Sequence, residues 1–452
     1  MKKIIPLIKS RIDPILASNT RLRIARGAIW GTVGTVATRS VTILLSFALA
    51  RILGKDGFGE YGIINSTAAM ISGFTGLGIG VTVTRYVASL RAREPERAGK
   101  IIGLSSIITW FSALLYGAVF IYFAPWLAKT TLAAPHLAPM LQISAISIGL
   151  GVVNSVQVST LTGLEAFKAS SILSTIFGIV QSVLVIVFAW YAGVKGAVIA
   201  LALASSLTVI AYYVFSRREL NNAKIRVTIK EAWSEWRVLV KYSLPAFLGT
   251  ITVGPVIWAS NALLANQQHG YGQLGIYSAA MQWDAVVQFF PGLVFTAVLP
   301  VMSDLYGRGD KKGSIDLMWK MMKFTAFIVI PIASIVSLLS PLIIKGYGSS
   351  FSGGHMVIVI VVFTTVLSSI STSLGFFIAA AGRMWILFAI NTAWGISFIL
   401  FSFYMVKWGA EGIAGAKFLA YALHFIWSFA ICVIFSRKLN RDHKSLLPVA
   451  PA

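Results

Sequence analysis

The chain has 452 residues, of which 57% are hydrophobic and 12% charged, and its mean hydropathy is +0.80. Soluble domains carry about 25% charged residues, so the composition excludes that class and predicts an integral membrane protein. The formal net charge of +23 does not indicate a nucleic-acid partner, which would require a soluble basic face. The single cysteine, Cys432, excludes a disulfide framework and a cysteine metal site, and we expect no metal and no cofactor.

The first half of the chain is predicted to form an N-terminal lobe. Residues 1–27 are basic and interrupted by prolines, which indicates a cytoplasmic lead-in lying on the membrane surface. Six apolar runs follow within residues 28–215, and each is long enough to cross about 30 Å of hydrocarbon as a helix. These runs are 28–50, 61–84, 101–124, 140–162, 170–191 and 197–215.

The second half repeats this organisation. A polar, basic linker at 216–241 is predicted to join the lobes on the cytoplasmic side, and Trp233 and Trp236 indicate an interfacial helix within it. A C-terminal lobe at 242–435 and a cytoplasmic tail at 436–452 complete the chain. Its apolar runs are 242–265, 275–302, 321–344, 356–381, 385–406 and 413–435. We therefore predict an all-α polytopic membrane protein with about twelve transmembrane helices.

The distribution of basic residues predicts the orientation. With the N-terminus inside, the inward segments carry 30 of the 38 Lys and Arg residues, and the outward gaps carry 7, with Lys417 counted among the latter. Positive charge is enriched in cytoplasmic loops of membrane proteins. Both termini are therefore expected in the cytoplasm.

A glycine motif marks two related halves. Residues 57–63, Gly-Phe-Gly-Glu-Tyr-Gly-Ile, return at 270–276 as Gly-Tyr-Gly-Gln-Leu-Gly-Ile. Both copies match the Gly-x-Gly-x-x-Gly dinucleotide fingerprint, but no acid lies about 20 residues on, and the flanks are too long and apolar for a βαβ unit. We interpret the copies as tight turns between helices at the outer rim. Six spans per half predict two parallel repeats with pseudo-twofold symmetry about the membrane normal, around a central cleft.

The segment at 51–62, Arg-Ile-Leu-Gly-Lys-Asp-Gly-Phe-Gly-Glu-Tyr-Gly, resembles that of polysaccharide-biosynthesis flippases. These are the O-antigen repeat-unit translocases of the multidrug/oligosaccharidyl-lipid/polysaccharide exporter superfamily. Residues 163–168 and the Gly-x-x-Gly at 193–196 and 409–412 also fit. The resemblance implies alternating access in the inner membrane, a polyprenyl-pyrophosphate-linked oligosaccharide as substrate, and polysaccharide polymerase and chain-length machinery as partners. The related lipid II flippases usually have two additional helices, which this chain lacks.

Two charges are expected near the middle of the membrane. Arg39 lies about 16 Å into the first span and Asp284 about 14 Å into the eighth. A charge at this depth costs at least about 2.5–3.5 kcal/mol, so it should face a cavity or a partner. Arg39 is predicted to anchor the substrate pyrophosphate, or else to form a structural clasp with Asp284 or a backbone carbonyl. Asp284 is an ion-coupling site, a gate partner of Arg39, or a satisfied polar residue.

Polar residues within the spans are candidates to line the cleft and bind sugar hydroxyls. The alternative is that they form hydrogen bonds between helices. We assign Asn65, Asn261 and Gln282 to substrate binding. The full set is Asn65, Ser66, Asn154, Gln157, Gln181, Asn261, Gln282 and Gln288.

Two other functions remain to be weighed. An ion-coupled multidrug or small-molecule exporter of the same superfamily predicts a carboxylate in the first span, where this chain has Arg39. A membrane-embedded glycan polymerase or glycosyltransferase would need catalytic groups and a sizeable extramembrane loop. The outward gaps are short, and no Asp-x-Asp occurs, so we do not expect an enzyme.

Overall fold

A computed structural model describes residues 19–75, 78–237 and 252–444 of the chain. The structure is built from helices, which confirms the all-helical prediction. The long helices are α2 (Asn19–Thr75), α3 (Ile79–Leu90), α4 (Pro95–Trp126), α5 (Ala138–Gly163), α6 (Phe167–Asn222), α8 (Val253–Ala265), α9 (Gly270–Gly307), α10 (Lys311–Tyr347), α11 (His355–Ala380), α12 (Met384–Met405) and α13 (Gly409–Lys444). Short helical turns are η1 (Leu127–Thr131), η2 (Pro135–Leu137), η3 (Ala232–Glu235), η4 (Ser349–Phe351) and η5 (Val406–Trp408).

Two of these helices are each interrupted by a reversal of the chain. Gly54 in α2 has φ of 66°, and Gly193 in α6 has φ of 58°. Glycine accepts this left-handed region without a steric penalty, so each label covers two consecutive helices. Among the described residues, seven helical stretches are long and apolar enough to cross a membrane. Their outer faces are apolar, with Leu338 81% exposed and Phe327 78% exposed, and the protein is a multi-pass membrane protein.

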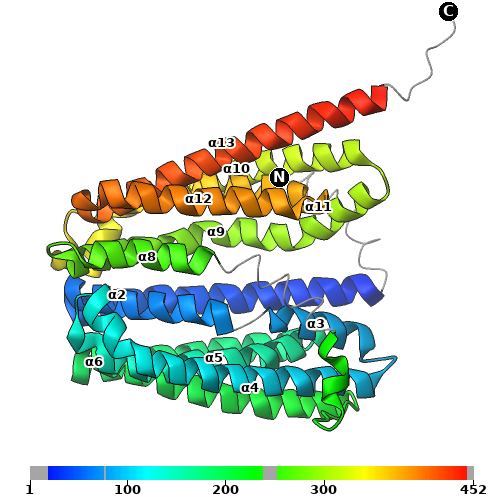
Figure 1. Ribbon diagram of the computed structural model, residues 1–452, viewed down its shortest axis with the longest axis horizontal. Helices are drawn as coiled ribbons and strands as arrows, with labels where there is room; N and C mark the ends of the chain where they lie inside the picture. Colours follow the sequence, from blue (N-terminus) through cyan, green and yellow to red (C-terminus); the bar gives the residue numbers. More distant parts are fainter. Residues whose placement is uncertain (1–18, 76–77, 238–251, 445–452) are drawn as a thin grey trace, which may run out of the picture.

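The helices form two groups (Figure 1). Helices α2 to α6 make the N-terminal lobe and α8 to α13 the C-terminal lobe, with α2 lying against α9. The end of the bundle with the reversals at Gly54 and Gly193 is called here the motif end. The opposite end, where α3 turns into α4 and α9 turns into α10, is called the linker end.

Among the described residues, the lobes share a hydrophobic core at the motif end. That core joins Leu49 and Ile64 of α2 to Leu274 of α9 and Ile358 of α11. Toward the linker end, the described residues form separate cores. One core lies in the N-terminal lobe and joins Val87 of α3 to residues of α4 and α6. The other lies in the C-terminal lobe and joins α9, α10, α11, α12 and α13. The lobes are therefore packed together at one end and packed independently at the other.

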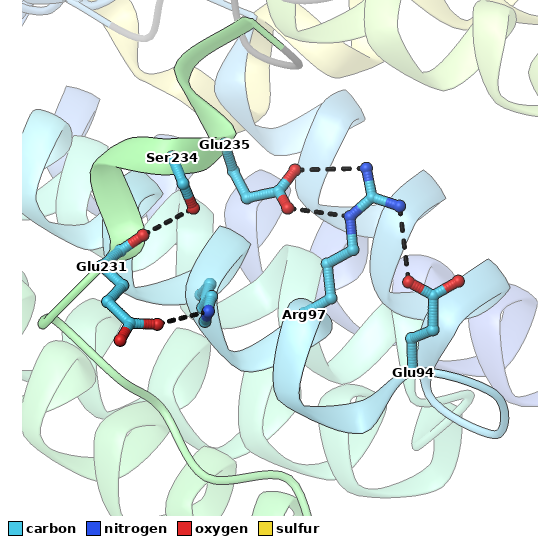
Figure 2. A network of polar contacts seen from close by, with 6 residues as sticks. Glu94, Arg97, Glu231, Ser234 and Glu235 are labelled. Carbon is cyan, nitrogen blue, oxygen red and sulfur yellow. Dashed lines mark hydrogen bonds and ion pairs between the residues drawn. The ribbon is translucent and has the colours of Figure 1, made fainter.

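A strap, defined here as residues 223–237, runs along α4 at the linker end. Arg97 donates to Glu235 at 2.8 Å, and Lys100 Nζ donates to Glu231 Oε2 at 2.6 Å (Figure 2). A side chain at Gly99 would overlap the carbonyl of Arg226, so this glycine permits the close approach of strap and helix. The two ion pairs and the close packing attach the strap to the N-terminal lobe.

The predicted linker is only partly described. Helix α6 continues to Asn222, past the predicted end of the sixth span at residue 215. The described part of the predicted interfacial helix contains the 3-10 turn η3, with Trp233 67% exposed. The rest of that helix and the start of the seventh span lie outside the described residues.

Candidate functional site

The two copies of the glycine motif pack directly on each other across the lobes. A side chain at Gly59 would overlap the carbonyl oxygen of Tyr271, and one at Gly275 would overlap that of Lys55. The prediction that the copies form turns is wrong. The chain reverses just before them, at Gly54 and at His269 (φ 55°), so both copies are helical. Their glycines allow two helix backbones to touch at the motif end.

Further contacts close the motif end between the lobes. The Tyr347 hydroxyl of α10 lies 3.1 Å from Ser46 Oγ of α2, and the Tyr347 ring packs on Phe47 with centroids 4.4 Å apart. Arg51 Nε donates to the Gly346 carbonyl at 2.8 Å. Tyr271 donates to the Leu132 carbonyl at 2.8 Å. The lobes are therefore held together on the motif-end side of the cleft.

Arg39 and Asp284 face one cavity of about 430 Å³ between α2 and α9. Arg39 lies about 22 Å along the helix from the reversal at Gly54, and Asp284 lies about 21 Å from the start of α9. The two charges, 245 positions apart in the sequence numbering, thus lie at one depth. The remaining lining residues are Thr35, Ala285, Gln288, Phe289 and Gly292.

The two charged side chains differ in their bonding. Thr365 Oγ1 donates to Asp284 Oδ1 at 2.6 Å, and Gln288 Nε2 donates to Oδ2 at 3.2 Å. Arg39 is exposed to the cavity and has no hydrogen bond or ion pair with any residue that the structure describes. The carboxylate is thus satisfied by its own lobe, whereas the five guanidinium donors remain available. A clasp between Arg39 and Asp284 is not formed in this structure.

Two smaller cavities continue the cleft toward the motif end, and the predicted amides line them. Asn65 and Gln282 border both cavities, which measure about 360 Å³ and 320 Å³. Asn261 borders the first and donates to Ser66 Oγ at 2.9 Å across the lobes. The Asn261 amide oxygen is buried and has no partner among the described residues. Carboxamides and hydroxyls of this kind can donate to and accept from sugar hydroxyls.

The other polar candidates divide between the cleft and the lobe interior. Gln181 and Ser66 line the smaller cavities, and Gln288 lines the cavity with Arg39. Gln157 does not join them, because it faces a separate pocket among α4, α5 and α6. The Asn154 amide oxygen is buried without a partner among the described residues.

Lys417 is a buried charge near the cleft. The count of loop charges places it in an outward gap, although the predicted span 413–435 contains it; α13 begins at Gly409, so Lys417 lies two turns inside the helix and is only 6% exposed. Its Nζ contacts Met281 Sδ at 3.3 Å, and Met281 borders the same cavity as Asn261. The predicted span 413–435 already contains this position, and the Gly-x-x-Gly at 409–412 forms the first turn of the helix.

Comparison with known proteins gives a family match. A model of the family described as "Polysaccharide biosynthesis protein" matches residues 24–306. The chain is also 23% identical, over 423 residues, to the EPS I polysaccharide export inner membrane protein EpsE of Ralstonia nicotianae. That alignment covers 89% of this chain and 92% of EpsE.

Two solved structures share the fold. An inward-facing multidrug resistance MATE family transporter of the MOP superfamily superposes with a TM-score of 0.75 at 14% identity, covering 90% of this chain and 99% of that one. The lipid II flippase MurJ, in an inward closed conformation, superposes with a TM-score of 0.69 at 18% identity, covering 89% of this chain and 87% of MurJ. The fold is thus shared by transporters with different substrates.

Proposed function

Because the chain belongs to the polysaccharide biosynthesis protein family, we propose that it is a flippase for a polyprenyl-pyrophosphate-linked oligosaccharide in the cell inner membrane. At family level, its relatives and structural neighbours are transporters of polysaccharide, lipid-linked precursors or drugs. We propose twelve crossings in two pseudo-symmetric lobes, with both termini in the cytoplasm. Polysaccharide polymerase and chain-length machinery would act on the translocated product.

The observation that carries this proposal is Arg39, which faces the cavity between the lobes and has no partner among the residues that the structure describes. A pyrophosphate is a compact dianion, and the planar guanidinium fork binds two of its oxygens at once. An arginine held in a cavity near the membrane centre favours an anionic substrate. Asn65, Asn261 and Gln282 would receive the sugars toward the motif end.

The closed motif end supports an inward-facing state under the proposed orientation. The substrate would enter between the separately packed cores at the linker end, with its lipid tail left in the bilayer. Release would require the glycine contact of Gly59 with Tyr271 and Gly275 with Lys55 to part. During alternating access, the lobes would then separate at the motif end and pack against each other at the linker end.

An ion-coupled multidrug exporter is the second candidate, favoured by the structural likeness to a MATE transporter. Such a protein would use Asp284 to bind a cation. In this structure the Asp284 oxygens are occupied by Thr365 and Gln288. If Asp284 instead couples transport to an ion gradient, Asp284→Asn abolishes the dependence on that gradient while leaving substrate binding intact.

The proposal is tested by glycan export in a flippase-null strain. At equal expression, we expect Arg39→Ala to reduce export at least about tenfold, because one charge-assisted contact of about 1.5–3 kcal/mol is lost. Arg39→Lys should be intermediate, since lysine keeps the charge but not the bidentate fork. Arg218→Ala, an exposed arginine outside the cleft, is the matched control. Full export by Arg39→Ala would refute the anchor.

A further inference from the structure

The N-terminal lobe contains a separate cavity of about 460 Å³ on its side away from the cleft. Its walls come from α4, α5, the second helix of α6 and the strap, and none of the lining residues belongs to α2 or the C-terminal lobe. In Figure 1 these helices lie on the far side of α2 from the C-terminal lobe. The volume is within the range of about 300–1,000 Å³ that is usual for small-molecule sites.

The cavity is mainly apolar, with one unsatisfied polar group. Seven of its sixteen lining residues are aliphatic, and exposed aromatic rings of Trp110 and Tyr213 border it. The Thr109, Ser106 and Thr160 hydroxyls each donate to a carbonyl of their own helix. The Gln157 amide oxygen is buried and accepts no hydrogen bond from the described residues. The aliphatic lining residues are Ile102, Ile107, Val153, Val156, Leu220, Val227 and Ile229.

The charge at the cavity is positive. Arg217 is the one charged residue among those that line it in the described structure. Its Nε donates to the Tyr213 hydroxyl at 3.1 Å, and its guanidinium lies 5.3 Å from the centre of that ring. This fixes the arginine beside the cavity, and its terminal NH groups have no hydrogen-bond partner among the described residues. The nearby cations Arg97 and Lys100 are already neutralised by Glu235 and Glu231 (Figure 2).

From their distance to the helix ends, we expect the polar groups of the cavity at the depth of lipid headgroups and glycerol. Arg217 is about 8 Å from the linker end of α6, and Gln157 is about 9 Å from the linker end of α5. Trp110 is 48% exposed and Tyr213 50% exposed. Such amphipathic rings concentrate at the boundary between headgroups and hydrocarbon. A free phosphate ion would match Arg217 but would leave the aliphatic walls unoccupied.

We propose that this cavity binds an anionic phospholipid with a hydroxylated headgroup, of the phosphatidylglycerol type, from the leaflet at the linker end. Its phosphate accepts hydrogen bonds from Arg217, and its headgroup hydroxyls lie beside the Gln157 side chain, which lines the same cavity. The first part of an acyl chain lies against Ile107 and Val153. The site is independent of the transported substrate, because none of the described residues that line it lines a cavity of the cleft.

Native mass spectrometry of the full chain in detergent tests the proposal, with phosphatidylglycerol and phosphatidylethanolamine titrated separately. Arg217→Ala should weaken phosphatidylglycerol binding at least about tenfold and leave phosphatidylethanolamine binding unchanged. The neighbouring exposed arginine gives the control, since Arg218 does not line the cavity. An equal loss in Arg218→Ala would overturn the proposal, because it would show binding to a general basic surface.

A second pair of variants fills the cavity without removing charge. Ile107→Trp should abolish the tight phosphatidylglycerol site, whereas Ile176→Trp, on an exposed α6 position outside the cavity, should not. Unchanged binding in Ile107→Trp would overturn the proposal. Displacement of phosphatidylglycerol by polyprenyl phosphate would also overturn it, because the cavity would then serve the lipid of the transported substrate.

Discussion

Arg39 and Asp284 lie at one depth in one cavity, yet within the described part of the chain only the carboxylate has hydrogen-bond partners. The sequence predicts this depth, because both residues interrupt apolar runs of known length. It does not predict their bonding. Thr365 reaches Asp284 from α11, 81 positions away, and only the folded packing of α9 on α11 brings the two side chains together.

Lys417 shows the limit of counting charges in loops. The count of loop charges places this lysine in an outward gap, although it falls inside the apolar run 413–435, and the structure buries it in a helix that begins at Gly409. The position of Gln157 in its apolar run predicts its depth in the membrane. It does not predict that Gln157 faces the separate pocket of the N-terminal lobe and not the cleft.

Replacement of Lys417 tests its energetic role. The described residues offer its amine only the Met281 thioether at 3.3 Å, and a buried cation without an anion is unfavourable. We expect Lys417→Met to have an equal or higher free energy of unfolding, by up to about 4 kcal/mol. Lys407→Met, at an exposed position, should change it by no more than about 0.5 kcal/mol. Thermal unfolding in detergent measures both, and a clear loss of stability in Lys417→Met would show that the lysine has an unrecognised favourable partner.

At the level of elements, the sequence reveals that the glycine motif is repeated but does not reveal what its glycines do. Its recurrence indicates equivalent places in two halves. The function of its glycines depends on the contact between α2 and α9, which brings Gly59 to Tyr271 and Gly275 to Lys55. A contact between separate helices cannot be read from either copy alone.

A methyl group at this contact should open the motif end. Gly59→Ala places Cβ against the Tyr271 backbone, whereas Gly73→Ala, also on α2, meets no atom within 4 Å. The reporter is Ser46→Cys in a chain whose Cys432 is replaced by alanine, because Ser46 is buried in the closed motif end. We expect an impermeant maleimide to label this cysteine severalfold more in Gly59→Ala than in Gly73→Ala. Equal labelling of the two variants would contradict the assignment of this contact as a gate.

At the level of the whole molecule, one shared core at the motif end and separate cores at the linker end define an inward-opening cleft under the proposed orientation. The sequence predicts helical class and related halves from hydropathy and repeats. It does not predict which end is closed, because the same helices must close either end during transport.

The strap gives a pH prediction. The hydrogen bond from Lys100 lowers the pKa of Glu231, and the hydrogen bond to Glu231 raises the pKa of Lys100. The pair therefore stabilises strap attachment at pH values above the ordinary pKa of a glutamate and below that of a lysine. This stabilisation is lost as the pH falls through the lowered pKa of Glu231, and also as the pH rises through the raised pKa of Lys100. A spin label at Ile229→Cys, with Cys432 replaced, should keep one mobility from about pH 5 to about pH 9.

Removal of Lys100 provides the matching variant. Lys100→Met should increase the label's mobile fraction at neutral pH, whereas Lys224→Met, an exposed cation elsewhere on the strap, should not. A large change of mobility within the predicted pH plateau would show that other groups hold the strap.

The central claim is that the cleft carries a polyprenyl-pyrophosphate-linked oligosaccharide across the bilayer with Arg39 as its anion anchor. The direct measurement uses proteoliposomes containing a fluorescent form of this lipid in both leaflets, with an impermeant quencher added outside. With the wild-type protein or Arg218→Ala, the quencher should remove nearly all of the fluorescence. With Arg39→Ala, the fluorescence of the inner leaflet should remain, as in protein-free liposomes. Protection with the wild-type protein, or full exposure with Arg39→Ala, would contradict the account.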